Sequence, residues 1–408
     1  MSHPIQHSFS QFFSEGHYET QSETLDVDLK SKKLLIGIPM ESTLYESRVS
    51  IVPNSVRTLI GYGHRILVEK DAGKSSNYSD RDYTEAGAEI SVTKEAVFKC
   101  SIIVKISPPT VEEIEMMNDG AILISAIQIP ILTQEYIHAL QKKRITALAM
   151  EYLQSDDGSF PVVRIMSEIA GMSAILVAAE YMNINKGGRG ILLGGVSGVP
   201  PAKVVILGAG VVGEFAAKAA LGLGASIRVF DNDITKLMRL QALVGRQLHT
   251  SSINPVYLAY QLTSADVVIG AIHSKHGRTP IIVTEEMVSK MKDGSVIVDV
   301  SIDQGGCIET SEMTTLKNPT FVKHGVTHYC VPNIASNVSR TASSAVSNIL
   351  TPLLIKAGSD LAFDNILYRS PGIRNGCYTF MGCLTNEYIA KRFGLKYTNL
   401  NLILASKA

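Results

Sequence analysis

The chain has 408 residues, and a domain usually takes about 100–200, so two or three domains are expected. Lys and Arg number 38, as do Asp and Glu, so the formal net charge is zero and no global field would attract nucleic acid. Hydrophobic residues make up 45% of the sequence, which excludes general disorder. The five cysteines form no C-x-x-C pair, which predicts a reducing, cytoplasmic location and no metal site.

Residues 1–33 are polar and include five acidic residues between Glu15 and Asp28. They predict an N-terminal extension, flexible or helical, in place of a packed domain. The first basic residue is Lys30 and no apolar region precedes it, which is not the pattern of a signal peptide. Because no stretch reaches the roughly 20 continuous apolar residues of a spanning helix, we expect no membrane segment.

From Leu34 the chain alternates short β-branched runs with helical stretches, the pattern of an α/β fold with parallel sheets. The strands predicted for a first unit, over roughly residues 34–160, are Leu34–Ile38, Arg65–Val68, Ile102–Ile106 and Ile122–Ile127. A helix follows from Ser167 to Met182. It is apolar on nearly all faces, so we expect it to be buried between two domains.

A second α/β unit follows a loop rich in Gly and Pro. Its predicted strands are Val204–Leu207, Ser226–Phe230, Val267–Ala271 and Ser295–Val300. From Arg340 to near Phe393 the sequence predicts mostly helix, packed back on the first unit.

A glycine-rich turn directly follows the first strand of the second unit. Gly208, Gly210 and Gly213 form G-x-G-x-x-G, in which the glycines permit a tight turn, close approach of a pyrophosphate and close helix–strand packing. Asp231 ends the next strand, where an acid binds the ribose hydroxyls of NAD and repels the extra phosphate of NADP. This pattern predicts NAD binding; a purely structural glycine turn is the alternative.

Three further charged residues are candidates for chemistry. Asp303 follows the strand Ser295–Val300, where ligands bind in open α/β sheets, and could exchange protons or cap a helix. Arg48 and Lys105 would together suit a small carboxylate, although each alone could be a surface charge. The histidines of the second unit (His273, His276, His324 and His328) lack a metal-binding motif, so we interpret them as loop or core residues.

With these residues in hand, the chain resembles the alanine dehydrogenase family from about Leu34 to Leu395. That family is close kin to the first soluble domain of the alpha subunit of proton-translocating nicotinamide nucleotide transhydrogenase. The shared motifs include I-G-I-P-M-E (36–41), E-S-R-V (46–49), M-S-E-I-A-G (166–171), D-V-S-I-D-Q-G-G (299–306) and K-H-G-V-T-H-Y (323–329).

The resemblance implies two Rossmann-like doubly wound parallel-sheet domains with a cleft between them. A discontinuous substrate domain would comprise residues 34–161 and 340–408, and an NAD-binding domain residues 162–339. The implied activity is NAD-dependent oxidative deamination of L-alanine to pyruvate and ammonia, and its reverse. The implied partners are a small 2-oxo acid or amino acid and further copies of the chain, in a dimer or hexamer.

The resemblance also assigns residues. Asp303 matches the catalytic aspartate, and Gln128 stands where the family has its catalytic histidine. The substrate-binding positions are Arg48, Lys105 and Asn333. The cofactor-binding positions are Ser167, Gly208, Gly210, Val211, Val212, Gly213, Asp231, Lys236 and Ile302.

Three departures keep other functions open. Glutamine at 128 can donate a hydrogen bond but cannot exchange a proton near neutral pH. Ser107 replaces the second of two family lysines, and residues 334–339 lack the family's proline. The alternatives are an alpha-type transhydrogenase subunit, a non-catalytic NAD-binding regulator and, more distantly, a saccharopine-type dehydrogenase. The sequence I-D-Q-G-G favours the dehydrogenase, and Gln128 favours the transhydrogenase subunit.

Overall fold

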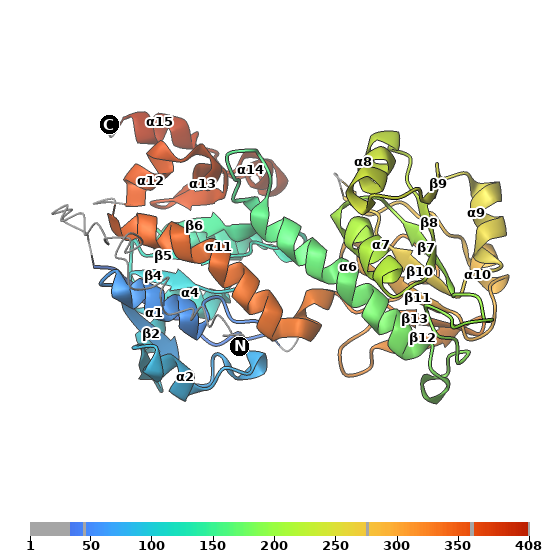
Figure 1. Cartoon of the computed structure of the whole chain (residues 1–408). Coiled ribbons are helices and arrows are strands. Elements are labelled where there is room, and N and C mark those ends of the chain that lie inside the picture. The colour runs from blue at the N-terminus through green and yellow to red at the C-terminus, as the bar shows by residue number, and fades with distance from the viewer. Residues whose placement is uncertain (1–32, 44–45, 275–276, 360–362, 407–408) are drawn as a thin grey trace, which may run out of the picture.

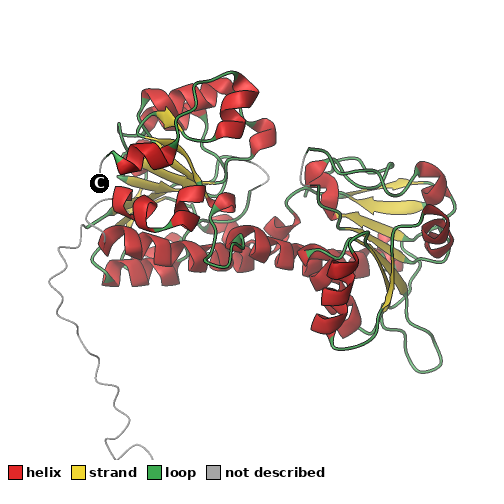
Figure 2. Ribbon diagram, turned by 90° about the horizontal axis from the view of Figure 1, so that it is seen from above, coloured by secondary structure: helices red, strands yellow, loops and turns green. Residues whose placement is uncertain are grey.

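The computed structural model describes residues 33–43, 46–274, 277–359 and 363–406. The expected extension lies outside these ranges, apart from Lys33. Two α/β units lie side by side, and the long helix α6 (Pro161–Tyr181) joins them (Figure 1). Seen from above, long helices run from beside the sheet of the first unit into the second (Figure 2).

The first sheet has the strand order β15-β14-β6-β5-β4-β1-β2-β3. Strands β1 to β6 run parallel, whereas β14 and β15 are antiparallel additions at one edge. The bounds are β1 Leu35–Ile38, β2 Arg65–Glu69, β3 Glu89–Ser91, β4 Ile102–Val104, β5 Ile122–Ser125, β6 Thr146–Ala149, β14 Cys377–Phe380 and β15 Cys383–Leu384.

The second sheet has the strand order β12-β13-β11-β10-β7-β8-β9, with only β12 antiparallel to its neighbour. The bounds are β7 Lys203–Leu207, β8 Ser226–Phe230, β9 His249–Ser251, β10 Val267–Gly270, β11 Val296–Asp299, β12 Thr320–Lys323 and β13 Val326–Tyr329. In both sheets the six parallel strands follow the doubly wound order 3-2-1-4-5-6. The predicted fold class is therefore confirmed.

Helices cover both faces of each sheet. In the first unit they are α1 Pro53–Gly61, α2 Asp80–Glu85, α3 Lys94–Phe98, α4 Val111–Met116, α5 Gln134–Lys142, α11 Ser339–Ser359, α12 Phe363–Arg369, α13 Pro371–Asn375, α14 Glu387–Phe393 and α15 Leu400–Ala405. In the second they are α7 Val211–Gly222, α8 Ile234–Val244, α9 Pro255–Leu262 and α10 Glu285–Ser289. Separate apolar clusters form on the two faces of each sheet, so each unit has its own core.

The C-terminal segment packs back on the first unit and is mostly helical, as predicted. Its helices are interrupted by β14 and β15, which were not predicted. The side chain of Thr379 in β14 donates a hydrogen bond to the carbonyl of Ile145, 234 positions away (3.1 Å). The formation of β14 therefore depends on a partner that is distant in the sequence. The local hydrophobic pattern does not reveal such a pairing.

Helix α6 begins at Pro161, earlier than predicted, because proline is well suited to the first turn of a helix. It is the one helix among the described residues with the length and hydropathy of a membrane span. It packs against α7, and a side chain at Gly171 would lie only 2.8 Å from the backbone nitrogen of Ala216 in α7. We therefore interpret α6 as a core helix that connects the two sheets.

Candidate active site

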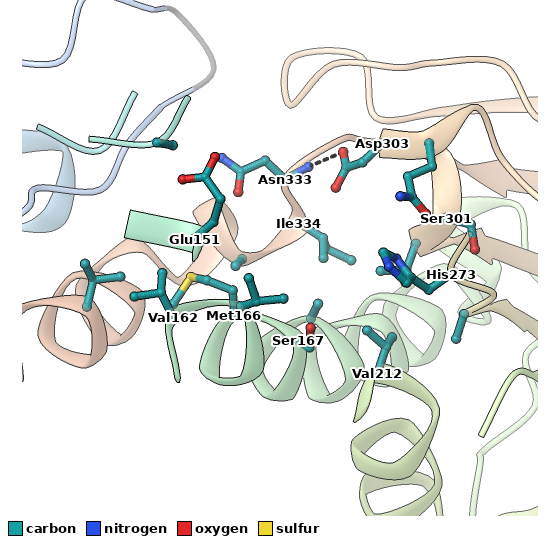
Figure 3. A pocket seen from close by; sticks show the side chains of 18 of the residues that line it. Glu151, Val162, Met166, Ser167, Val212, His273, Ser301, Asp303, Asn333 and Ile334 are labelled. Carbon is teal, nitrogen blue, oxygen red and sulfur yellow. Dashed lines mark hydrogen bonds between the residues drawn. The ribbon is translucent and has the colours of Figure 1, made fainter. Parts of the chain in front are cut away.

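A cavity of about 330 Å³ lies between the two units, beyond the carboxyl ends of strands from both sheets (Figure 3). The first sheet contributes residues that follow β1, β4, β5 and β6: Arg48, Ile106, Ala126 and Glu151. The second contributes residues that follow β10, β11 and β13: His273, Ser301, Asp303 and Asn333. Ligands of doubly wound sheets bind at these strand ends.

The apolar wall of the cavity is formed by two helices. Helix α6 contributes Val162, Met166, Ser167 and Ala170, and α7 contributes Val212 from its first turn. In Figure 3 Ser167 on α6 and Val212 at the start of α7 both project towards the cavity. Two predicted cofactor-binding residues, Ser167 and Val212, are therefore brought together at the second-sheet end of the cavity.

Arg48 lines the cavity as a member of a nearly buried ion pair. Its Nε lies 2.7 Å from Oε1 of Glu46, and its Nη2 lies 2.6 Å from Oε2, which is a bidentate contact. The two side chains are 10% and 3% exposed. Burial raises the pKa of Glu46, but the hydrogen bonds and charge of Arg48 outweigh burial, so the pKa lies below its usual value.

The same pair fixes Asn333. The side-chain amide of Asn333 donates to Oε2 of Glu46 (3.2 Å), and Ser336 donates to Oε1 (3.1 Å). Asn333 has a left-handed backbone (φ 53°), a conformation that Asn tolerates better than most residues. Predicted substrate-binding residues from both units, Arg48 and Asn333, thus share one hydrogen-bond network.

Asp303 lies on the opposite wall, in a 3-10 helix that follows β11 (Val300–Gln304). Its Oδ1 accepts a hydrogen bond from the backbone N–H of Asn333 (3.0 Å; Figure 3). The Asp303 side chain is exposed to the solvent in the cavity. Because it lies between the two units, protein atoms still surround it and remove part of its hydration. This partial desolvation raises the pKa of Asp303 above its usual value, and the nearby charge of Arg48 opposes the rise.

Lys105 is not brought into the cavity. Its side chain is fully buried, and its Nζ lies 2.9 Å from Oε2 of Glu41, 3.3 Å from Oγ of Ser42 and 3.9 Å from Oε2 of Glu113. Ile106, the next residue, lines the cavity in its place. A substrate-binding role for Lys105 stays a prediction.

Gln128 is also absent from the lining. It is exposed and has a left-handed backbone (φ 47°) at the start of a 3-10 helix, Ile129–Ile131. Its backbone N–H donates to Oε1 of Glu151 (3.3 Å). A catalytic role for the side chain of Gln128 stays a prediction.

The glycine turn joins β7 to α7 next to the cavity. Gly208 has φ 107°, which favours glycine, and Gly210 forms the N-cap of α7 with open space where a side chain would lie. A side chain at Gly213 would collide with the carbonyl of Gly208. The turn therefore leaves room above the first turn of α7, from Val211 onward, where helix amides attract a pyrophosphate. These residues fit a dinucleotide.

Asp231 lies beside this turn at the end of β8. Its Oδ2 accepts from the N–H of Ala209 (2.7 Å) and its Oδ1 from the N–H of Asp233 (2.8 Å), which places the carboxylate where a dinucleotide ribose binds in this fold. Lys236 is exposed on α8, with Nζ 3.9 Å from Asp233. Ile302 is buried under the strand end, so its contribution to a cofactor site would come through the backbone.

Two acidic residues of the site escaped the sequence analysis: Glu46, which holds Arg48 and Asn333, and Glu151, which lines the cavity. Glu46 belongs to a quoted motif, but its partners become apparent only in the fold. Glu151 follows β6, a strand that was not predicted; recognition of that strand would have placed a carboxylate at a strand end. Of the four histidines, His273 lines the cavity, His324 contacts Glu285 and His328 is buried against Thr310 and Phe321. His276 lies outside the described residues.

Comparison with known proteins agrees with this geometry. Residues 37–170 match the alanine dehydrogenase/PNT N-terminal domain, and residues 174–387 match the alanine dehydrogenase/PNT C-terminal domain. The chain belongs to the alanine dehydrogenase/PNT family. The resemblance seen in the sequence is thereby confirmed.

Within the alanine dehydrogenase/PNT family, several similar proteins are named alanine dehydrogenase. One from Staphylococcus haemolyticus is 39% identical over 369 residues, covering 90% of this chain and 98% of that protein. One from Methanococcus maripaludis is 40% identical over 370 residues, with the same coverage.

Two solved structures share the whole family fold. A structure of L-alanine dehydrogenase superposes with a TM-score of 0.83 at 35% identity and covers 88% of this chain and 99% of its own. A transhydrogenase from Sinorhizobium meliloti superposes with a TM-score of 0.74 at 26% identity and covers 87% and 99%.

Proposed function

We propose that this protein is an NAD-dependent amino-acid dehydrogenase that deaminates L-alanine oxidatively to pyruvate and ammonia and catalyses the reverse amination. The observation that carries the proposal is the cavity between the two sheets. There a guanidinium, Arg48, and a carboxyl group, Asp303, line the same space beside a glycine turn that fits a dinucleotide. The similarity to alanine dehydrogenases over 90% of the chain supports the same activity.

Arg48 and Asn333 are the proposed substrate-binding residues. Arg48 would bind the substrate carboxylate, and its orientation is already fixed by Glu46. Asn333 offers a polar side chain in the same network. Apolar side chains of Val162 and Met166 leave room for a small side chain such as a methyl group.

Asp303 is the proposed catalytic acid–base residue. Deamination requires several proton transfers at the substrate nitrogen and at water, and a positioned acid–base group contributes about 10²–10⁴ in rate. Partial desolvation in the cleft raises the pKa of Asp303, which brings proton exchange closer to neutral pH. Its bond from the N–H of Asn333 holds one oxygen in place.

The cofactor is NAD. When bound, NAD accepts a hydride from the substrate Cα. The proposed contacts are the first turn of α7 (Val211, Val212) and its glycines for the pyrophosphate, Asp231 and Lys236 for the ribose end, and Ser167 and Ile302 beside the cavity.

The decisive experiment is NADH oxidation with pyruvate and ammonium, run beside a panel of other 2-oxo acids. Highest activity with pyruvate is the expected result. Similar rates with larger 2-oxo acids would contradict the assignment of alanine.

An alpha-type transhydrogenase subunit remains a second candidate, because Gln128 replaces the family histidine and the fold matches a transhydrogenase. Such a subunit would bind NADH but leave pyruvate unreduced, and it would co-purify with a membrane partner. NADH binding without any turnover and without such a partner would instead indicate a non-catalytic regulator.

The proposal includes a homo-oligomer, a dimer or hexamer. Large apolar side chains on α6 and the following loop are exposed, among them Met172, Leu176, Ile184 and Leu192. Patches of this kind often mark subunit interfaces. Light scattering at micromolar concentration should give a multiple of 44.1 kDa; a purely monomeric species would contradict this part.

A cytoplasmic location and the domain boundaries complete the proposal. All five cysteines lie among the described residues and are free thiols, in keeping with a reducing compartment. The proposed boundaries are 34–161 with 340–408 for the substrate domain and 162–339 for the NAD domain. They are supported by the strands of the first sheet, which come from both ends of the chain.

A further inference from the structure

Glu151 occupies a strand end that faces the cavity from the first unit. It lies in a 3-10 helix (Met150–Tyr152) directly after β6, and β6 pairs in parallel with β5. The chain that leaves β5 therefore passes beside Glu151. Oε1 of Glu151 accepts hydrogen bonds from the N–H groups of Ile127 (2.8 Å) and Gln128 (3.3 Å). These two bonds fix the position of the carboxyl group.

The second oxygen of this carboxyl group has no partner of its own. Oε2 of Glu151 is out of contact with solvent and accepts no hydrogen bond from the residues that the structure describes. Glu151 lines the cavity, and Figure 3 places its side chain in the same space as Asn333. Since a buried acceptor without a partner is costly, this oxygen is suited to a ligand or water molecule that enters the cavity.

We propose that Glu151 is a catalytic residue that exchanges a proton with the water that hydrolyses the substrate imine. The inference rests on the proposed function, which produces an imine once the substrate is oxidised. Hydride loss from the amine leaves a protonated imine. The water oxygen bonds to the imine carbon, the C=N π electrons become a lone pair on nitrogen, and one water proton moves to Oε2, which gives a neutral carbinolamine. The carboxylic acid then returns that proton to nitrogen; as the C–N bond breaks and ammonia leaves, the hydroxyl O–H electrons form the C=O bond of the ketone, and the hydroxyl proton passes to the Glu151 carboxylate and from there to water.

The chemistry of the neighbouring residues favours Glu151 for this step. The amide side chain of Gln128 cannot take up a proton near neutral pH, although it stands at the position of the family histidine. Asp303 lies on the opposite wall and comes from the other sheet, so the cavity offers two carboxyl groups from two directions. With two acid–base groups, one can transfer the protons of the oxidation step and the other those of the hydrolysis step.

The surroundings of Glu151 prepare it for proton exchange. Burial raises its pKa, and hydrogen bonds from its own backbone N–H and from those of Ile127 and Gln128 only partly oppose the rise. The phenols of Tyr136, Tyr378 and Tyr152 lie near it, and burial raises the pKa of each, so all three stay neutral near pH 7. Across the cavity, the charged or titratable groups are those of Arg48, Asp303 and His273.

The test is Glu151→Gln in the full-length protein. Glutamine keeps an acceptor oxygen for the N–H groups of Ile127 and Gln128 but cannot exchange the proton. We expect the steady-state kcat for alanine to fall by about 10²–10⁴. A rapid burst of NADH, about one per active site, should remain in stopped-flow traces, because oxidation precedes hydrolysis. The acid limb of the wild-type kcat–pH profile should disappear, a change that a merely structural role would not produce.

Controls separate this role from loss of fold. NADH affinity, measured by fluorescence titration, should stay within about twofold of wild type. Glu135→Gln makes the same chemical change at an exposed position on α5 and should leave kcat unchanged. Should Glu151→Gln fail to bind NADH, Glu151→Asp provides the test: it should keep the burst and a shifted acid limb with a lower kcat.

Three results would overturn the inference. They are a kcat for Glu151→Gln close to wild type, loss of the burst together with turnover, or an unchanged acid limb. Wild-type protein that is inactive with alanine and pyruvate would instead refute the proposed function, and the inference with it. The activity of wild type therefore distinguishes the two failures.

Discussion

Replacement of Arg48 by alanine should separate substrate binding from stability. The variant loses a charge-assisted hydrogen bond to the substrate carboxylate, a contact of about 1.5–3 kcal/mol, so KM for pyruvate should rise roughly ten- to hundredfold. It also leaves Glu46, whose side chain is only 3% exposed, without its bidentate partner. Loss of one member of a buried ion pair costs about 3–5 kcal/mol of unfolding free energy.

The loss of unfolding free energy in Arg48→Ala depends on pH because Glu46 titrates. In the wild type its folded pKa is lowered, so the pair stabilises the fold above the unfolded pKa and loses this effect as pH falls through the folded value. Without Arg48, burial dominates and raises the folded pKa. As pH falls through that raised value, Glu46 is protonated in the folded variant, and the loss of unfolding free energy caused by its unpaired charge becomes smaller. Both trends shrink the stability difference between wild type and variant in acid.

The assay is urea unfolding at pH 7.5 and pH 5, beside pyruvate kinetics and NADH titration. The double variant Glu46→Gln/Arg48→Ala should regain much of the lost stability, because no buried charge is left unpaired, but not the affinity for pyruvate. NADH affinity should hardly change in either variant. An unchanged KM for Arg48→Ala, or a double variant no more stable than the single one, would refute the reasoning.

Asp303→Asn should lower kcat by about 10²–10⁴ while NADH titrations show unchanged affinity, and near-normal turnover would remove Asp303 from the mechanism. Asp231→Ala should narrow the preference for NAD over NADP in calorimetric titrations, and tighter NADP binding by the wild type would contradict the predicted role. Lys105→Ala tests the predicted substrate-binding residue that lies outside the cavity: NADH binding should stay unchanged, a raised KM for pyruvate would support the predicted role, and an unchanged KM would remove it. The substitution should also lower the urea midpoint, because Glu41 loses the ammonium 2.9 Å away; loss of NADH affinity in this variant would argue against separate substrate and cofactor sites.

The sequence by itself determined the features that are local in the chain. The glycine turn between β7 and α7 needs only a strand, three glycines and a helix in succession, and Asp231 and Asp303 follow apolar runs that are visible in the sequence. These runs become buried parallel strands because β-branched side chains pack well on both faces of a sheet. Arg48 and Asn333 were recognised by resemblance, and both line the cavity.

The tertiary structure alone decided what depends on distant segments. β6 reads T-A-L-A, which has no strong strand propensity, and it becomes a strand between β5 and β14. That pairing in turn places Glu151 at the cavity with one oxygen bound and one free of partners. The ion pair of Lys105 with Glu41 joins residues 64 positions apart, and it takes the lysine out of the cavity. Such pairings arise only when the folded chain removes both groups from water, so no local pattern could have shown them.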